Sequence, residues 1–204
     1  MVSGLWGKKI GMTQVFDENK VVPVTVLDVD HWIVTNIREK DRDGYNAVQV
    51  GRLRNRYTSQ PFSPLWLKEL KKYFSHIREI KVEDVTNFKV GKPVEFYLNM
   101  QPGDSVDVTG ITTGRGFAGV VKRHGFSGPP GSHGSKMGKR PGSISHMRSQ
   151  GKVIKGKRLP GHMGVQQRVV RGLEVVRIEP DKKIMLIKGS VPGKAGSLLF
   201  VRKA

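Results

Sequence analysis

One long stretch of this sequence contains no acidic residue. No Asp or Glu occurs from Val108 to Leu173, a run of 66 residues. Its central part, residues 112–168, holds 12 Lys or Arg, 13 Gly and 4 Pro but only 13 apolar residues among 57. A segment with so few apolar residues cannot bury a core of its own. We therefore predict that residues 112–168 form a long, basic, Gly-rich extended arm that becomes ordered on a partner.

The charge of the whole chain indicates a polyanionic partner. Lys and Arg number 36 and Asp and Glu 17, a net charge of +19, and residues 112–168 carry +12 of it. Such a surplus is typical of proteins that bind nucleic acid or an acidic membrane surface. A membrane-binding segment would be an amphipathic helix with Trp, Phe or Leu on one face, whereas this segment has no Trp or Tyr and only one Leu. The longest apolar runs are too short to span a bilayer, and the first residues lack a signal-peptide core. We therefore expect a nucleic-acid partner and no membrane.

The residues outside this basic segment predict a mainly β fold. The chain has 26 Val and 11 Ile against 4 Ala, and β-branched residues favour strands where Ala favours helices. Apolar or alternating runs separated by Gly and Pro turns predict strands at residues 21–27, 32–37, 45–50, 94–98, 104–110, 169–178, 183–188 and 197–202. Short antiparallel strands at this spacing predict a small closed β-barrel or a sandwich.

One segment, residues 63–74, has a helical pattern instead. Ser63 is a candidate N-cap, and Pro64 suits the first helical position, where its missing N–H costs nothing. The apolar residues that would share one face are Trp66, Leu70, Tyr73 and Phe74. We assign this helix to an α+β subdomain of about residues 52–93, inserted in the barrel. The predicted organisation is a β-barrel body, residues 1–111 and 169–204, and the arm, residues 112–168.

Two short motifs resemble nucleotide-binding loops. Residues 114–119 match G-x-G-x-x-G, but a dinucleotide fingerprint also needs a helix there and an acidic residue about 20 positions later. The Gly and Pro residues that follow cannot sustain a helix, and no acid occurs before Glu174. Residues 151–157 match the start of a P-loop, but Arg158 stands where Ser or Thr would hold Mg²⁺. We predict instead flexible backbone and cations that lie close to phosphates.

The chain offers little for catalysis. It has no Cys, which excludes disulfides, thiolate zinc sites and a Cys nucleophile. The histidines of the basic segment, spaced by 9, 13 and 16 residues in no standard metal motif, are His124, His133, His146 and His162. A Ser–His–Asp triad is recognised by geometry and not by order, and there is no G-x-S-x-G motif. We predict no enzyme activity, no cofactor, no metal and no small-molecule substrate.

Among nucleic acids, the basic segment favours RNA. It has no recognition helix or zinc finger for a DNA groove. An irregular RNA fold offers crevices that a thin Gly-rich chain can enter, and Arg both reaches phosphates and stacks on bases. The predicted RNA-binding residues are Arg115, Lys122, Arg123, Lys136, Lys139, Arg140, Lys152, Lys155, Lys157, Arg158 and Arg168.

Several motifs, in order along the chain, resemble one known family. They are Gly4 to Phe16, Val106 to Gly110, Gly114 to Arg123, Pro141 to Ile144, Gly151 to Val153, Lys155 to Arg158, Gly161 to Gly164, Leu173 to Val176 and Val191 to Gly193. Together they resemble bacterial-type ribosomal protein number three of the large subunit. The similarity covers most of the chain and is weakest at residues 55–92.

The resemblance implies a six-stranded barrel of the translation-protein type with an inserted α+β piece. It implies a structural role in the cytoplasmic ribosome, binding to large-subunit (23S-type) ribosomal RNA near its 3′ domain early in assembly, and contacts with neighbouring ribosomal proteins. It also implies an arm tip that approaches the peptidyl transferase centre without doing chemistry. The tip residues are Gly142, Ser143, His146, Met147, Arg148, Ser149 and Gln150.

Two other functions remain open from the residues alone. The first is an RNA chaperone or nucleoid-type basic protein that acts outside the ribosome. The second is an enzyme acting on RNA, which would need a catalytic acid or a metal site in the basic segment. A ribosomal protein would stay on large subunits through a high-salt wash, and a chaperone would not.

Overall fold

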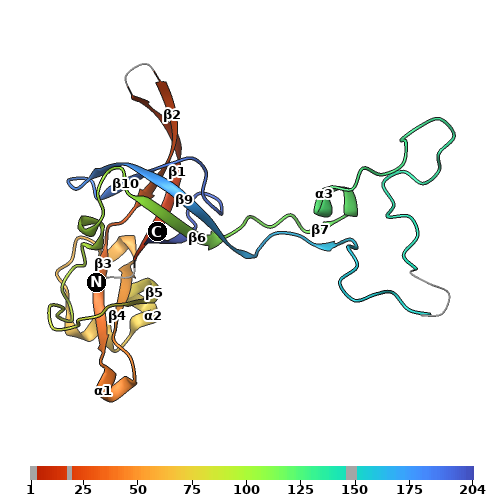
Figure 1. Cartoon of the computed structure of the whole chain (residues 1–204). Helices are drawn as coiled ribbons and strands as arrows, with labels where there is room; N and C mark the ends of the chain where they lie inside the picture. The colour runs from red at the N-terminus through yellow and green to blue at the C-terminus, as the bar shows by residue number, and fades with distance from the viewer. Residues whose placement is uncertain (1–3, 18–19, 146–150) are drawn as a thin grey trace. The chain divides into compact units, whose positions relative to one another are not determined.

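The computed structural model describes residues 4–17, 20–145 and 151–204. Strands dominate it, which confirms the mainly β fold that the composition predicts, and the chain divides into two compact units (Figure 1). We call Met1–Ile111 together with Gln167–Ala204 the body, and Thr112–Gln166 the arm unit. None of the helices among the described residues is long and apolar enough to cross a lipid bilayer.

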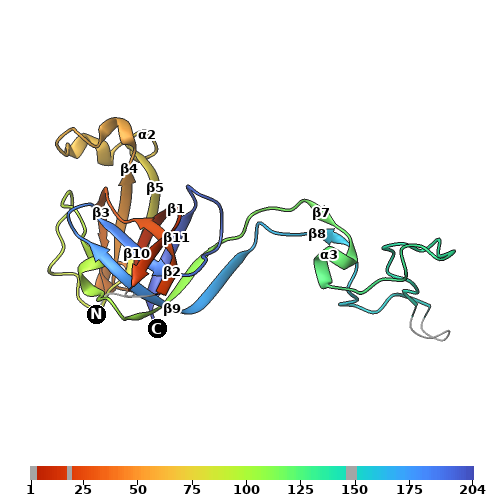
Figure 2. The ribbon, with the colours of Figure 1, turned by 90° about the horizontal axis from the view of Figure 1, so that it is seen from above.

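Six antiparallel strands of the body close into a barrel in the order β1-β11-β6-β9-β10-β2 (Figure 2). They are β1 (Leu5–Asp17), β2 (Lys20–Asp28), β6 (Ser105–Ile111), β9 (Gln167–Glu179), β10 (Ile184–Lys188) and β11 (Leu198–Lys203). The side chains that alternate into the interior and are fully buried include Val106, Val108, Met185, Ile187, Leu199 and Val201. This period of two is the pattern that predicts strands at those positions.

Strand β1 is not among the predicted strands. Its glycines and lysines interrupt the apolar alternation, and pairing with β2 and β11 holds it in place. Lys9 is buried within it, and its ammonium donates hydrogen bonds to the carbonyl oxygens of Val191 (3.2 Å) and Gly193 (3.1 Å). Burial lowers the pKa of Lys9 below its ordinary value of 10.5. A lysine satisfied by distant carbonyls gives no local signal in the sequence.

A second sheet of three strands has the order β3-β4-β5. It consists of β3 (Trp32–Arg38), β4 (Ala47–Leu53) and β5 (Phe74–Lys81). The expected strands at 32–37 and 45–50 therefore lie outside the barrel, and this sheet begins well before residue 52. The boundary between the barrel and this second sheet differs from the expected one. An apolar alternation shows that one face of a strand is buried, but it does not show which strand pairs with it.

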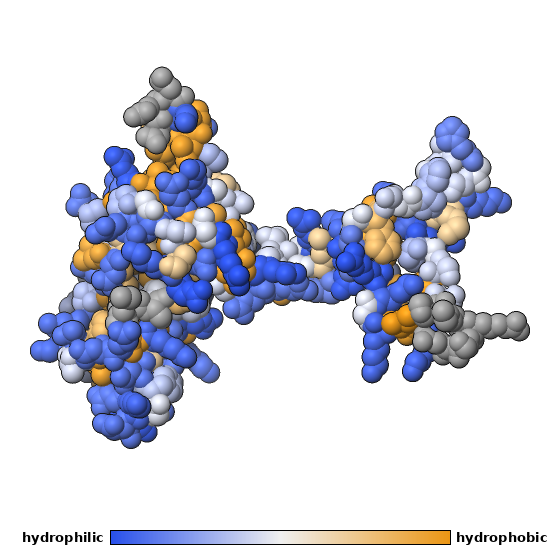
Figure 3. Space-filling model, viewed as in Figure 1, coloured by the Kyte–Doolittle hydropathy of each residue, from blue (hydrophilic) through white to orange (hydrophobic). Residues whose placement is uncertain are grey.

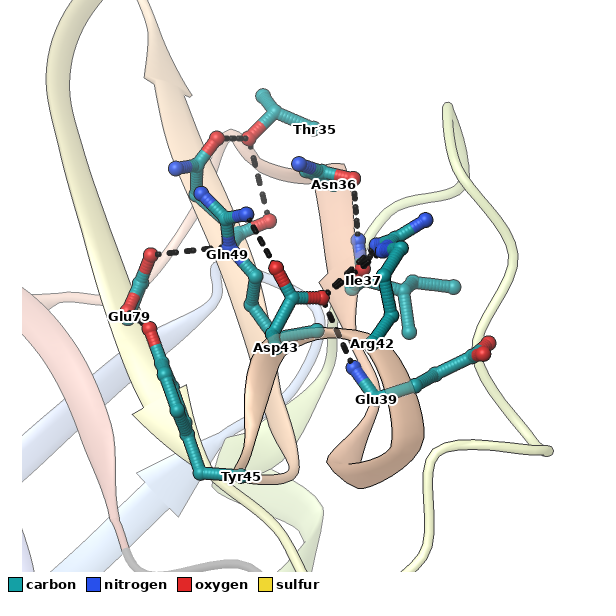
Figure 4. Close-up of polar contacts among 10 residues, drawn as sticks. Thr35, Asn36, Ile37, Glu39, Arg42, Asp43, Tyr45, Gln49 and Glu79 are labelled. Carbon is teal, nitrogen blue, oxygen red and sulfur yellow. Dashed lines mark hydrogen bonds and ion pairs between the residues drawn. The ribbon is translucent and has the colours of Figure 1, made fainter.

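A polar network fixes the connection between β3 and β4 (Figure 4). The one-turn helix α1 (Lys40–Asp43) ends at Gly44, whose φ of 83° is left-handed. The Asp43 carboxylate accepts hydrogen bonds from the side chains of Arg38 (2.7 Å) and Arg42 (3.0 Å). Just before β4, the Tyr45 hydroxyl donates to the carboxylate of Glu79 on β5 at 2.9 Å. The connection between β3 and β4 is thus a helical turn capped by Gly44.

The predicted helix at residues 63–74 is not continuous. The segment forms a 3₁₀ turn, η2 (Pro64–Leu67), and a separate one-turn helix, α2 (Leu70–Tyr73), and Ser63 makes no side-chain cap hydrogen bond. The stacked rings of Trp66 and Tyr73, 5.3 Å apart, hold the two turns together. The sequence prediction fails here because this aromatic packing favours a bend before β5 over a straight helix.

Two further 3₁₀ turns lie in the body, η1 (Asn55–Tyr57) and η3 (Phe96–Asn99). The second replaces the strand predicted at residues 94–98. Phe96 and Tyr97 are both buried in this turn. Apolar residues in a short run are compatible with either a strand or a buried turn, and the pattern alone does not separate the two.

One apolar core joins the barrel to the β3-β4-β5 sheet. Its buried members include Leu27 and Val106 from the barrel and Val34, Val50 and Ile80 from the sheet. The body is therefore a single packed unit. Because β6 and β9 pair as far as Ile111 and Gln167, the chain leaves and re-enters the body at adjacent positions.

The arm unit contains little regular structure. Strand β7 (Phe117–Ala118) pairs with β8 (Gly161–His162), and helix α3 (Val120–His124) follows β7. We predicted that the residues after 119 could not sustain a helix, and helix α3 shows that this was wrong for one turn. The turn ends at Gly125, whose φ of 71° is left-handed. Among the described residues of the arm unit, the buried apolar side chains are Ala118 on β7 and Val120 on α3.

Candidate nucleic-acid interface

The predicted RNA-binding cations are nearly all at the surface. Ten of the eleven side chains are exposed, and they are Arg115, Lys122, Lys136, Lys139, Arg140, Lys152, Lys155, Lys157, Arg158 and Arg168. All but Arg168 belong to the arm unit; Arg168 lies on β9 in the body. Because residues 112–166 include no Asp or Glu, no carboxylate of the arm unit neutralises its cations.

The two chain segments at the base of the arm unit are held together by backbone hydrogen bonds. The N–H of Arg115 donates to the Met163 carbonyl and the N–H of Met163 to the Gly116 carbonyl, both at 2.9 Å. The N–H of Thr112 donates to Gln166 (2.9 Å) and that of Val165 to Thr112 (3.1 Å). This ladder keeps the base of the arm unit narrow, and the Arg115 side chain projects from it into solvent.

Gly164 makes this close approach sterically allowed. Its φ is +84°, and a Cβ at this position would lie 2.2 Å from the carbonyl oxygen of Thr113 on the opposite segment. A side chain would therefore need both a strained backbone and a separation of the two segments. Here glycine serves the packing of the arm unit itself.

Arg123 differs from the other predicted cations. It is only half-exposed, and its guanidinium donates to the carbonyl of Leu159 at 2.6 Å. His124 makes a second contact with the same carbonyl through Nε2 at 3.0 Å. A Cβ on Gly161 would lie 3.0 Å from the Arg123 guanidinium. Arg123 thus ties α3 to the returning segment, a role that sequence reasoning did not assign to it.

Four cations cluster within residues 151–158, the segment whose first seven residues match the start of a P-loop. A backbone hydrogen bond from Lys157 to Ile154 (3.3 Å) closes a turn, and Gly156 within it has a φ of +80°. The exposed cations of this segment are Lys152, Lys155, Lys157 and Arg158. No helix follows the turn within residues 151–166, so the segment lacks the strand–loop–helix arrangement of a nucleotide-binding P-loop.

Two of the described histidines of the arm unit contact backbone carbonyls. His124 contacts Leu159, and Nε2 of His162 lies 3.0 Å from the carbonyl oxygen of Gly164. His133 is exposed, with a φ of 59°. Among the described residues, no group of three or more His, Cys, Asp or Glu side chains is close enough together to hold a metal ion.

The predicted tip is described only in part. Gly142 and Ser143 are exposed, and Gly142 has a φ of +79°. The remaining tip residues, His146, Met147, Arg148, Ser149 and Gln150, lie outside the described residues.

Comparison with known proteins identifies the family. A family model described as Ribosomal protein L3 matches residues 67–184. A large ribosomal subunit protein uL3 of Pelotomaculum thermopropionicum is 41% identical, with 100% of this chain and 98% of that protein covered. This chain belongs to the ribosomal protein L3 family. A uL3 protein of Desulfitobacterium hafniense is 44% identical over 98% of this chain and 94% of its own length.

Membership of the L3 family determines the general role of the chain. It is a structural constituent of the large ribosomal subunit, within the cytoplasmic ribosome, and not an enzyme. The prediction from the sequence motifs is therefore confirmed at the level of the family.

The body of this L3-family chain has a second basic cluster that sequence reasoning missed. His76 on β5 lies directly opposite Arg52 on β4. Burial, and after it nearby positive charge, lowers the pKa of His76 below its ordinary value of 6.5. The cations responsible are Arg78, Arg52, Lys8 and Arg54. The spacing of two residues between His76 and Arg78, on one face of a strand, was the available signal.

Two carboxylates at or near the start of β6 are already engaged within the body. Asp107 on β6 accepts hydrogen bonds from the Arg202 guanidinium (3.1 Å) and the N–H of Gly172 (3.2 Å). The bond from Arg202, and then that from Gly172 despite burial, lowers the pKa of Asp107 below its ordinary value of 3.8. Asp104 similarly accepts a hydrogen bond from Lys203 at 2.8 Å. Both acids are thus paired within the body, Asp107 with Arg202 and Asp104 with Lys203.

Proposed function

We propose that this chain binds large-subunit (23S-type) ribosomal RNA through the arm unit, and that residues 112–168 extend into the RNA fold. The observation that carries the proposal is the exposure of nine arm-unit cations in a segment without any acidic residue. Each cation that meets a phosphate releases condensed counterions, which favours binding. An Asp or Glu in such surroundings would face repulsion from phosphates, and this explains why the segment excludes acids.

The body has a complementary role in this proposal. A barrel of the translation-protein type, with the β3-β4-β5 sheet as its α+β insertion, holds both ends of the arm at adjacent positions. Fixing the two ends lowers the conformational entropy that the arm loses on binding. We propose that such binding occurs early in assembly, near the 3′ domain of the RNA, and that the tip residues 142–150 approach the peptidyl transferase centre.

Neighbouring ribosomal proteins are the proposed partners of the body. The β1–β2 hairpin continues beyond the strands that flank it, because β11 pairs with β1 only up to Lys8 and β10 pairs with β2 only from Val24. Apolar side chains lie exposed on this extension, as the orange surface there shows (Figure 3). They are Ile10, Met12, Phe16 and Val21, each more than half exposed. Contiguous exposed apolar side chains are typical of a protein–protein contact.

The salt dependence of RNA binding tests the role of the arm unit. The assay titrates the purified chain against a fragment of large-subunit RNA from the 3′ domain over a series of salt concentrations. If about eight arm cations meet phosphates, log K falls against log salt with a slope near −6, from about 0.7–0.9 per contact. A slope shallower than about −2 would contradict the proposal.

Charge-neutralising variants locate the contacts within the chain. Changing four exposed cations of the arm unit to Gln is expected to make the slope shallower by about 3; they are Lys152, Lys155, Lys157 and Arg158. The matched control changes four exposed lysines of the body, which are Lys20, Lys40, Lys68 and Lys89. A larger effect from the control set would place the RNA contacts on the body instead.

A further inference from the structure

The arm unit contains a hollow that combines apolar side chains with one of the predicted RNA-binding cations. It has a volume of about 550 Å³ and lies between two segments, residues 125–129 and 137–142. Its walls include Phe126, Met137 and Arg140. Apolar side chains are scarce in this unit, and Figure 3 shows only a few of them, orange to cream, among the blue of the polar residues. Two of them line one hollow, which indicates a specific role for this place.

Glycines bring the two segments together. Gly128 has a φ of +71°, and a Cβ there would lie 3.7 Å from the carbonyl oxygen of Gly138, which itself has a φ of +54°. The N–H of Arg140 donates to the Met137 carbonyl at 3.2 Å, which closes a turn next to the hollow. The backbone therefore sets the separation of the walls without a packed core.

The aromatic wall is held in place by its neighbour. The Phe126 ring lies 6.1 Å from the His124 ring, in a tilted arrangement, and His124 in turn contacts the Leu159 carbonyl. Phe126 is half-buried, whereas Phe117 of the same unit is 79% exposed and lies outside the hollow. The ring of Phe126 is thus supported on one side by His124 and contributes to the wall of an open hollow.

The chemistry of the walls fits a flat aromatic group beside a negative charge. An aromatic ring and a thioether favour a π-system, and the Arg140 guanidinium binds phosphate in a bidentate geometry. Lys136 and Lys139, both exposed, lie close by in the sequence, and the unit has no carboxylate to repel an anion. A volume of this size lies within the range of pockets for a single small ligand and is too small for a helical segment of RNA.

We propose that this hollow binds one unpaired nucleobase of RNA, stacked on Phe126, with an adjacent phosphate on Arg140. The base must be unpaired because both faces of a base in a helix are covered by its neighbours, whereas loop and bulge bases can stack on aromatic side chains. The inference rests on the proposed RNA binding of the arm unit and adds a recognition of bases to a recognition of phosphates.

The test compares two single-stranded RNA probes that have the same backbone charge. One is a fluorescein-labelled oligoadenylate of twelve nucleotides, and the other is an abasic oligoribonucleotide of equal length. Binding of the full chain is measured by fluorescence anisotropy over a salt series. Phe126→Leu is expected to lower the affinity for oligoadenylate by about tenfold, and to leave the affinity for the abasic probe and the salt slope unchanged.

Three further variants complete the comparison. Phe126→Tyr keeps an aromatic ring and is expected to bind both probes as the wild type does. Phe117→Leu removes an exposed ring outside the hollow and is expected to change neither affinity. Arg140→Ala is expected to weaken binding to both probes and to make the salt slope shallower by about 0.7.

Three results would overturn the inference. They are the absence of any preference of the wild type for the probe with bases, an unchanged affinity of Phe126→Leu for it, and an equal loss of affinity for both probes. In the last case Phe126 would act only through the conformation of the arm unit. If any of these occurs while the wild-type slope stays steep, the base site fails and the RNA-binding function stands. A shallow wild-type slope, in contrast, refutes the proposed function itself.

Discussion

Gly164→Ala should open the base of the arm unit while leaving the body intact. The new methyl group would lie 2.2 Å from the Thr113 carbonyl oxygen, and the φ of +84° is strained for any L-residue. The left-handed backbone alone costs about 1–2 kcal/mol. The clash is with backbone, which cannot rotate away as a side chain can, so the two segments must separate.

Two other glycines of the arm unit separate the cost of the left-handed backbone from the cost of the clash with Thr113. Gly116 has a φ of +64° but nothing within 4 Å of its Cβ position, so that Gly116→Ala carries only the backbone cost. Gly119 has a φ of −68° and equally open surroundings, so Gly119→Ala should be tolerated. The expected order of destabilisation is Gly164→Ala, then Gly116→Ala, then Gly119→Ala.

Amide hydrogen exchange measured by NMR reads this out at individual residues. The reporters are the N–H groups of Arg115, Met163 and Val165, which bridge the two segments. Protection of these amides should fall by about 5- to 30-fold in Gly116→Ala, from the 1–2 kcal/mol above, and should be lost in Gly164→Ala. Amides of the body, such as that of Val175, should not change. Equal protection in all three variants would refute the argument that Gly164 is required for close approach.

Three further outcomes are expected. Because the Arg202 bond lowers the pKa of Asp107, this group stabilises the fold above its unfolded pKa, and the contribution is lost as the pH falls through the lowered value. Asp107→Asn should therefore weaken the dependence of denaturant midpoints on pH below about pH 5, and an unchanged dependence would contradict this. Replacing residues 114–166 by a short Gly/Ser turn should leave a body with a cooperative thermal transition, since the apolar core lies in the body; a molten spectrum without a transition would contradict it. Arg148→Ala ribosomes should assemble at normal yield yet differ from the wild type in peptidyl-transfer rate, whereas reduced subunit yield with an unchanged rate would make the tip a mere anchor.

Much of the body could be predicted from the sequence because strands with one buried face carry a period of two. Strands β2, β6, β9, β10 and β11 all follow from such patterns. The β1 strand does not, because its buried lysine is satisfied by carbonyls about 180 residues away. The sequence pattern also cannot show that β3 and β4 belong to a separate sheet, because it indicates which face of a strand is buried but not which strand is its neighbour.

The site shows a similar division. Composition alone indicates an acid-free segment at residues 112–168, and the arm unit spans Thr112–Gln166. The exposure of its lysines follows from charge. Two other features cannot be predicted from the sequence: the contact of Arg123 with Leu159, and the hollow beside Phe126. Both depend on backbone segments that are distant in the sequence and that left-handed glycines bring together. For the basic cluster at His76, the sequence carries only the spacing between His76 and Arg78, because Arg52, Arg54 and Lys8 come from other strands or their ends.

The central claim, that the arm reaches into large-subunit RNA, is tested most directly by tethered hydroxyl-radical cleavage. The chain has no Cys, so a single cysteine can carry an Fe(II)–EDTA group at a chosen position. Ser143→Cys on the arm unit and Ser190→Cys on the body are both at exposed positions. In assembled large subunits, the group at position 143 should cleave RNA of the peptidyl transferase centre, and the group at position 190 should cleave different RNA. Cleavage from position 143 that is absent, or confined to the RNA cleaved from position 190, would contradict the claim.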